Sequence, residues 1–195
     1  MTAIPIVETM VGDITAFIPT NVISITDGQV YLETEMFNAG QRPAINVGLS
    51  VSRVGRAAQH KAMRDVSGNL RLEVAQYRDI AVFAQFGADI DSATAAQLRH
   101  GERLMKLLIQ PAERVYSLAE QTVLLIAASS GVFENFELNE VPDTVISILE
   151  FIEANASSVI RSINTTKKLS ETDRFDIDRL LKQFTQKNGE SNAEN

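Results

Sequence analysis

One loop of the sequence could do phosphate chemistry: the segment Gly48–Gly55, which carries Arg53 among hydroxyl-bearing serines, with glycines near both ends. Arginine keeps its charge at physiological pH, and its planar guanidinium matches the geometry of phosphate oxygens. Such a loop can therefore bring a permanently charged donor to a phosphate. A surface arginine in a turn with solvated serines explains the same residues, so both interpretations stay open at this point.

Other residue types that could do chemistry carry weaker signals. His60 and His100 are forty residues apart and lack the spacing of metal ligands, so we expect no metal site. Asp89 and Asp91 lie at a break between predicted helices, where we expect a helix cap in a solvated loop or an exposed contact loop. Acid–base chemistry by these carboxylates would need a buried partner or a nucleophile, and the sequence supplies neither.

Motifs that hold a triphosphate do not occur in these residues. The sequence contains no Gly-x-x-x-x-Gly-Lys-Ser/Thr loop, no Gly-x-Gly-x-x-Gly turn and no Gly-x-Ser-x-Gly elbow. We therefore expect the 195 residues by themselves to be catalytically inactive and to bind no nucleotide tightly.

Composition narrows the class of protein further. The formal charge of -7 and the pI near 4.9 argue against a general nucleic-acid binder, although they do not exclude a local basic patch. The absence of cysteine excludes disulfides and thiolate metal sites. The first residues lack the pattern of a signal peptide, and apolar runs such as 122–128 are too short to span a bilayer. We expect a soluble polypeptide that reaches a membrane only through partners.

The first sixty residues are rich in β-branched residues and in turn signals. Residues 3–7 are typical of a short buried strand that ends at a turn at Gly12. Segments 21–25 and 29–33 flank the turn signal Asp27-Gly28, which favours a hairpin or, equally, a strand that enters an active-site loop. These residues are too few for a sheet of about five or six strands, so they indicate a piece of a larger α/β domain.

After residue 60 the hydrophobic spacing becomes helical. The fold class is therefore α+β and mostly α: a partial α/β segment over residues 1–59, an all-α helical bundle over 60–187, and a disordered polar tail over 188–195. The predicted helices are 70–84, one capped by Asp91 or Ser92 that runs to Leu108, one opened by a capping box at Ser117, one that starts at Pro142, and 170–184.

Four strings, in this order, resemble the alpha subunit of F-type ATP synthases: residues 2–12, 18–33, 40–59 and 70–86. Within them VISITDGQ and RPAINVGLSVSRVG are highly specific, and the match continues in register to about Gln121 and more loosely to about residue 185. The resemblance covers only the end of the family's nucleotide-binding domain, after its phosphate loop, and the helical domain that follows. We therefore expect a fragment, natural or engineered.

The resemblance implies roles at the catalytic interface for three residues. Arg53 matches the arginine finger that reaches from alpha to the γ-phosphate in the catalytic site of the beta subunit. Ser24 matches a serine that lines the same interface, and Ser50 one that matters for signalling between catalytic sites.

A second implied site holds the adenine of alpha's own, non-catalytic nucleotide. Phe37, Arg42 and Pro43 match one wall of it, and Gln110 matches a residue of the facing loop. Here Ala112 and Glu113 replace the family's second glutamine and its aromatic residue, which puts the adenine contact in doubt. ATP or ADP with magnesium would belong to the intact subunit.

Phe86, Asp89 and Asp91 match the loop that faces the rotating central stalk. The implied partners are the beta subunit, the gamma stalk and the delta or peripheral-stalk subunits, in a peripheral complex on the cytoplasmic face of a bacterial membrane or its organellar equivalent. The implied function is ATP synthesis and hydrolysis coupled to proton transport. A non-coupling paralogue of the alpha subunit, or a purely structural helical interaction module, stays open as the alternative.

Overall fold

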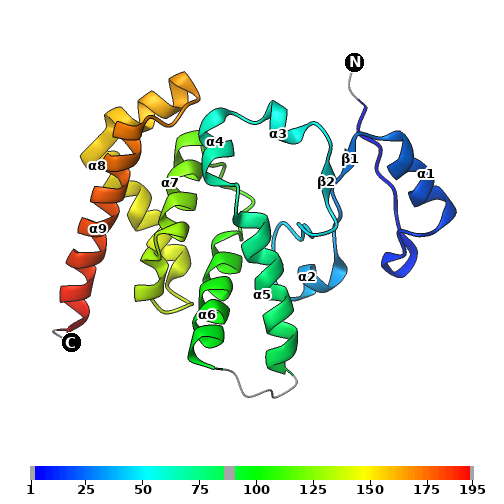
Figure 1. The fold of residues 1–195 in the computed structure, drawn as a ribbon, viewed down its shortest axis with the longest axis horizontal. Coiled ribbons are helices and arrows are strands. Elements are labelled where there is room, and N and C mark those ends of the chain that lie inside the picture. Colours follow the sequence, from blue (N-terminus) through cyan, green and yellow to red (C-terminus); the bar gives the residue numbers. More distant parts are fainter. Residues whose placement is uncertain (1–2, 86–90, 194–195) are drawn as a thin grey trace. The chain divides into compact units, whose positions relative to one another are not determined.

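The structure is a computed structural model that describes residues 3–85 and 91–193 of the chain, with side chains to residue 84 and from 91 to 187. The chain divides into two compact units, Met1–Ala58 and Gln59–Asn195. Helices dominate the second unit and are the longest elements of the first, and the named strands of the described residues form one small two-stranded sheet (Figure 1). The mostly helical α+β class predicted from the sequence is therefore confirmed.

The first unit is built from short elements joined by ordered loops. Its sheet pairs β1 with β2 in antiparallel register, Gly28 opposite Ser52 and Gln29 opposite Val51. An isolated bridge joins Leu32 to Ile45. The elements are η1 (Met10–Gly12), α1 (Phe17–Ile25), β1 (Gly28–Gln29), α2 (Thr34–Asn38), β2 (Val51–Ser52) and α3 (Gly55–Ala58).

The predicted buried strand at residues 3–7 is wrong for this structure. The segment has no strand pairing, and Ile4 and Ile6 expose 85% and 96% of their surface. A strand needs a neighbour to satisfy its backbone hydrogen bonds, and none of the described residues pairs with this segment. The turn predicted at Gly12 does form, because Gly12 has φ +76° and the Asp13 N–H donates to the Met10 carbonyl at 3.0 Å.

The predicted hairpin around Asp27-Gly28 is also wrong, because residues 21–25 belong to helix α1. Pro19 lies in the first turn of that helix, where the missing N–H costs nothing. Asn21 donates to the Phe17 carbonyl at 2.8 Å and Ser24 to the Asn21 carbonyl at 2.7 Å, both along the helix. Strand β1 instead finds its partner more than twenty residues later, as the open alternative of a strand entering a loop allowed.

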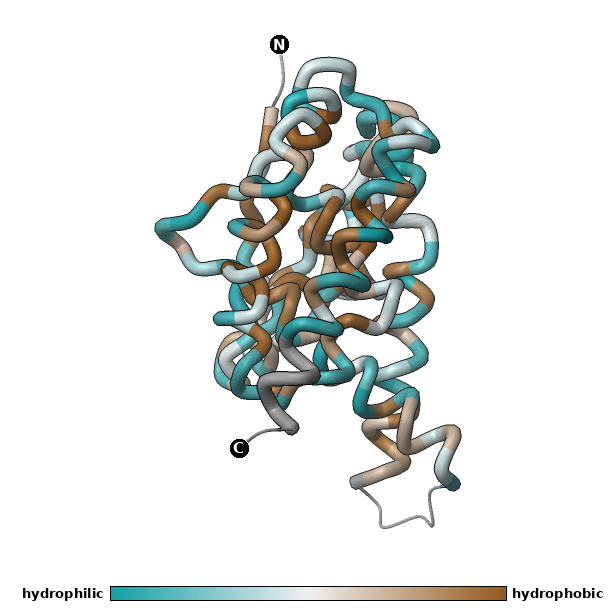
Figure 2. Tube along the Cα trace, turned by 90° about the vertical axis from the view of Figure 1, so that its left-hand side faces the viewer, coloured by the Kyte–Doolittle hydropathy of each residue, from teal (hydrophilic) through white to brown (hydrophobic). Residues whose placement is uncertain are grey.

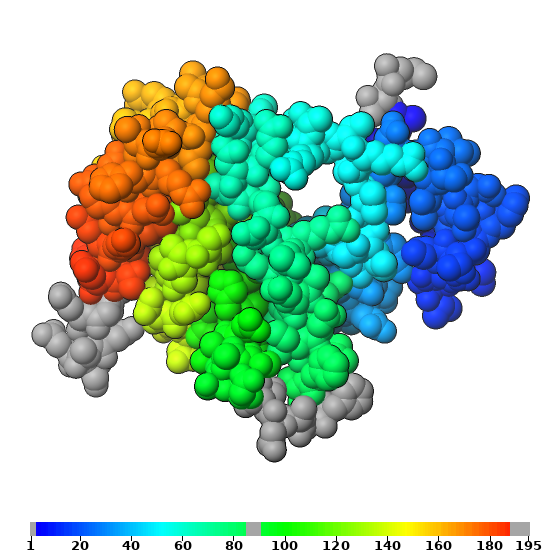
Figure 3. Space-filling view, in the orientation of Figure 1, coloured from blue at the N-terminus to red at the C-terminus, as the bar shows by residue number. Residues whose placement is uncertain are grey.

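The second unit is a helical bundle around α7. This helix packs against α4, α8 and α9, while α5 and α6 lie side by side (Figures 1 and 3). The elements of the second unit are α4 (Lys61–Val66), α5 (Leu70–Gln85), α6 (Ser92–Leu107), α7 (Leu118–Ser129), η2 (Val132–Asn135), α8 (Val141–Thr166) and α9 (Glu171–Ala193).

Hydrophobic and hydrophilic residues are interspersed along these helices (Figure 2), as expected for amphipathic helices that pack with one face toward a core. The largest side chains among those that are fully enclosed are Ile148, Ile152, Ile163, Ile177 and Leu181. None of the helices in the described residues is both long enough and apolar enough to cross a membrane.

Local signals place the starts of three helices of the second unit as predicted. Asp91 caps α6 by accepting the Thr94 N–H at 2.7 Å. Ser117 and Glu120 form the predicted capping box at the start of α7, and Pro142 lies in the first turn of α8. Helix α9 continues to Ala193, into the segment 188–195 for which the sequence predicts disorder.

Candidate functional site

The backbone of Arg53 is fixed where strand β2 ends. Its N–H donates to the Asp27 carbonyl at 2.9 Å, one residue beyond the pair of Ser52 and Gly28. A Cβ at Gly28 would collide with the Val51 carbonyl oxygen, so the close approach of the two strands depends on glycine. The Arg53 side chain is exposed and has no hydrogen bond or ion pair with the part of the chain that the structure describes. The result is a guanidinium on an anchored backbone, open to a ligand or a partner.

The two serines of the Arg53 loop hold its backbone. Ser50 Oγ accepts the Tyr31 N–H at 3.0 Å and donates to the Asn46 carbonyl at 2.6 Å. Ser52 Oγ accepts the Gly55 N–H at 2.8 Å. Both hydroxyls therefore form hydrogen bonds within the protein, and the interpretation of merely solvated serines does not describe them.

Ser24, the third residue predicted at the catalytic interface, lies near the end of α1 and is exposed. It stands three residues before Asp27, whose carbonyl accepts the Arg53 N–H.

Phe37 and Arg42 come together as an aromatic–guanidinium pair. The Arg42 guanidinium carbon lies 4.3 Å from the centroid of the Phe37 ring, and Phe37 is 52% exposed. Pro43, next in the chain, is also exposed. A planar cation stacked beside an exposed aromatic face offers a surface on which a flat ring can stack.

Gln110 belongs to the second unit and has a local partner. Its Nε2 donates to the Arg114 carbonyl at 2.7 Å, which closes the turn that also contains Ala112 and Glu113. Both of those side chains are exposed. Of the residues predicted to contact adenine, Phe37, Arg42 and Pro43 belong to the first unit and Gln110 belongs to the second.

Of the three residues predicted to face a rotor, only Asp91 lies within the described residues; Phe86 and Asp89 lie outside them. Hydrogen bonds from Thr94 hold the pKa of the Asp91 carboxyl below its ordinary value. This carboxylate therefore stays charged and serves as a helix cap.

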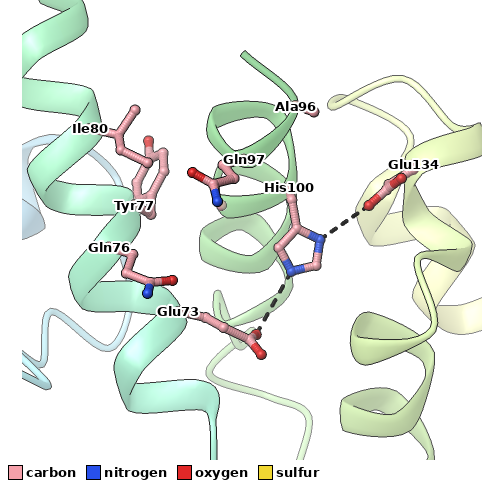
Figure 4. Close-up of a pocket in the computed structure, with 9 residues that line it drawn as sticks. Glu73, Gln76, Tyr77, Ile80, Ala96, Gln97, His100 and Glu134 are labelled. Atoms are coloured by element: carbon pink, nitrogen blue, oxygen red, sulfur yellow. Dashed lines mark ion pairs between the residues drawn. The ribbon is translucent and has the colours of Figure 1, made fainter. Parts of the chain in front are cut away.

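A cavity of about 270 Å³ between α5, α6 and η2 was not predicted from the sequence. His100 lies between two carboxylates, with Nε2 3.7 Å from Glu73 and Nδ1 3.3 Å from Glu134 (Figure 4). Burial and the nearby charge of Glu102 raise the pKa of Tyr77, which also lines the cavity. These residues are scattered over three elements, so no local spacing could reveal them. In the described chain, no three acidic or imidazole side chains are arranged to hold a metal ion.

Comparison with protein families gives matches for most of the chain. Residues 59–184 match the C-terminal domain of the ATP synthase alpha/beta chain, and residues 1–52 match the nucleotide-binding domain of the ATP synthase alpha/beta family.

Similar proteins carry the name ATP synthase subunit alpha. The protein from Lawsonia intracellularis is 50% identical over 171 residues, which is 88% of this chain and 34% of that protein. Those from Shewanella piezotolerans and Syntrophomonas wolfei are each 46% identical over 95% and 94% of this chain, and 36% of their own length. The chain thus spans about a third of the length of the curated relatives it matches. The chain belongs to the ATP synthase alpha/beta family, and the relatives named above are alpha subunits.

Proposed function

We propose that this chain forms the part of a rotary F-type ATP synthase alpha subunit that supplies Arg53 as the arginine finger to the catalytic site of a neighbouring beta subunit. The observation that carries the proposal is the exposed Arg53 guanidinium on a backbone fixed by Asp27 and β1. A finger must be held firmly at its base and free at its tip, and Arg53 meets both conditions.

The physical role of such a residue is electrostatic. During phosphoryl transfer, negative charge spreads over the oxygens of the transferred group, and a guanidinium that enters from a neighbouring subunit stabilises that charge. The guanidinium acts mainly on the transition state, while the beta subunit holds the nucleotide in the ground state. Ser24 and Ser50 would lie at the same interface, with Ser50 supporting the loop as described.

Alpha's own nucleotide would contact Phe37, Arg42 and Pro43, and we expect Gln110 to contribute to the same nucleotide's binding. The stacked pair of Phe37 and Arg42 fits a planar base. The 195 residues carry no phosphate loop, so they do not fit the triphosphate and its magnesium ion, which would need other parts of the intact subunit.

The isolated chain should therefore bind Mg-ATP weakly and hydrolyse none. Titration calorimetry measures this directly, with the intact subunit as the positive control. A micromolar affinity in the isolated chain would contradict the proposal that these residues contribute only the base contacts.

In the intact complex the chain would contact the beta subunit, the gamma stalk and the delta or peripheral-stalk subunits. The complex would couple ATP synthesis and hydrolysis to proton transport as a peripheral assembly on the cytoplasmic face of the bacterial membrane or its organellar equivalent. Asp91, with Phe86 and Asp89, would belong to the loop that faces the stalk. The family match and the alpha-subunit relatives support these assignments.

Replacement of Arg53 tests the proposal in a complex of beta and gamma with a full-length alpha subunit that contains these residues. We expect Arg53→Ala to lower multisite ATP turnover by about 10³–10⁵-fold, because the transition-state charge loses its partner. Arg53→Lys should be nearly as slow, since a point charge cannot reproduce the planar fork. Nucleotide binding at the catalytic sites, measured on the same complexes, should largely survive.

Arg56→Ala is the matched control, because Arg56 is an exposed arginine three residues away in α3. It should keep close to the parental rate. If Arg53→Ala kept that rate instead, the finger assignment would be wrong and Arg56 would be the next candidate. If neither substitution changed turnover, the chain would serve as a structural interaction module.

A further inference from the structure

Asn46 is the polar residue most deeply built into the first unit. It is only 5% exposed, while most of the residues around it are half-buried or exposed. Burial of an amide is costly unless its donors and acceptors are paired, so its hydrogen bonds show what the burial achieves.

The Asn46 side chain joins two stretches of chain. Its Nδ2 donates to Glu33 Oε2 at 3.0 Å, and its Oδ1 accepts the N–H groups of Gly48 and Leu49 at 3.0 and 3.1 Å. The first bond reaches back thirteen residues, and the other two fold the start of the Arg53 loop into a tight turn.

The Asn46 backbone adds three more bonds to the same two stretches. Its N–H donates to the Tyr31 carbonyl at 2.8 Å. Its carbonyl accepts from both the N–H and the Oγ of Ser50, at 3.0 and 2.6 Å. Since Ser50 Oγ also accepts the Tyr31 N–H, the two stretches are locked together on both sides of Asn46.

Arg53 lies three residues after Ser50, and its own backbone is bonded to Asp27 on the far side of β1. The loop is therefore held at two ends: at Asp27 by the strand pair and at Asn46 by the hydrogen bonds to Glu33 and Tyr31. Apolar packing contributes little here, because Leu49, Val51 and Val54 are exposed. The polar bonds at Asn46 are what fixes the start of the loop.

We propose that Asn46, oriented by Glu33, is the positioning residue that sets where the Arg53 guanidinium stands. The inference rests on the proposed function, since it assumes that Arg53 acts at a catalytic site. Asn46 itself touches neither nucleotide nor phosphate; it acts through the backbone of the loop. A displacement of about 1 Å at a reacting group can lower a rate a hundredfold, so loss of this anchor has a measurable consequence.

The test uses the complex of beta and gamma with the full-length alpha subunit. Asn46→Ala removes the side-chain bonds to Glu33, Gly48 and Leu49. We expect kcat for ATP hydrolysis to fall about a hundredfold, while catalytic-site nucleotide affinity stays within about threefold of the parental value.

A reversed hydrogen bond separates positioning from simple loss of folding. Asn46→Asp keeps the acceptor for Gly48 and Leu49 but places a carboxylate against that of Glu33, and kcat should fall. Adding Glu33→Gln to Asn46→Asp restores an amide–carboxylate bond with donor and acceptor exchanged. We expect this double variant to recover most of the parental kcat. Glu33→Gln alone should not raise kcat above the parental value.

Arg53→Ala, measured alongside, distinguishes the two hypotheses. In that background Asn46→Ala should cause no further fall in single-turnover hydrolysis, because the group it positions is gone. If Arg53→Ala is slow but Asn46→Ala is as fast as the parent, the positioning role is overturned and the finger stands. A further large fall in the Arg53→Ala background, or failure of the reversed bond to rescue kcat, also overturns it. A parental rate for Arg53→Ala overturns the proposed function itself.

Discussion

The two units of the chain are stabilised in different ways. The second unit encloses an apolar core in which Ile148, Ile152 and Ile163 are fully buried. In the first unit the buried residues of the described chain are Pro19, Ala44 and Asn46, and the side chains of many large hydrophobic residues are exposed. The first unit is instead held by hydrogen bonds between loops, which centre on Asn46 and Asp27.

The residues that stabilise the fold and the residues proposed to act on nucleotide are concentrated in different units. Burial of apolar surface supplies most of the free energy of folding, so the helical unit is able to fold as a cooperative domain. The first unit carries the exposed Arg53 and the Phe37–Arg42 pair, and its exposed apolar surface is typical of a segment that packs against further protein. Arg53 and the Phe37–Arg42 pair thus lie in the unit that has fewer buried apolar side chains.

The largest expected effect is in hydrogen exchange. The amide of Leu124, in the buried helix α7, should exchange only through global unfolding, at a free energy of about 5–15 kcal/mol. The amides of Ile4, Ile6 and Val7, in a segment whose isoleucines are exposed, should exchange with little protection. Mass spectrometry of the deuterated chain measures both. Equal protection of the two segments would contradict the comparison, unless self-association covers the first unit, which dilution would reveal.

Two substitutions of the same type give the next largest contrast. Ile148→Ala removes a fully buried side chain and should lower the free energy of unfolding by about 2–5 kcal/mol, through lost burial and the cavity left behind. Ile6→Ala removes a side chain that is 96% exposed and should change it by less than about 0.5 kcal/mol. Urea denaturation followed by circular dichroism reports both values. A similar cost for the two would show that residue 6 is packed in solution.

The smallest effect is a pH dependence to which one aspartate in each unit should contribute. Hydrogen bonds from Thr94 lower the pKa of Asp91, and those from Thr15 lower the pKa of Asp13. A carboxyl with a lowered folded-state pKa stabilises the fold above its ordinary pKa, and this contribution is lost as the pH falls through the lowered value. Acid should therefore weaken the capping of α6 through Asp91.

Thermal unfolding of the helical unit between about pH 5 and pH 2 measures this effect. Asp91→Asn keeps a capping oxygen but does not titrate, so part of the acid sensitivity should disappear. Asp13→Asn is the matched control in the first unit and should leave the unfolding of the helical unit unchanged. If both variants had the same pH profile as the parent, Asp91 would not contribute to the stability of the folded helix.

Local chemistry in the sequence was sufficient to predict where several helices of the second unit begin. The capping residues Asp91 and Ser117, the helix start at Pro142 and the 3.6-residue hydrophobic period all depend on neighbours within a few positions. Because a helix satisfies its hydrogen bonds within one segment, its ends can be predicted from the residues that lie there.

The secondary structure of the first unit could not be predicted without its tertiary contacts. The segment 21–25 has the same apolar, β-branched composition in a strand or in α1, and periodicity over so few residues cannot separate the two. The true partner of β1 is β2, and a pairing across more than twenty residues leaves no local trace. Arg53 and Phe37 were predicted from sequence strings that resemble the alpha subunit, and the structure added how the backbone of Arg53 is held. Asn46 reads as one polar residue among many until the fold buries it, because only long-range packing decides which amide must be fully bonded.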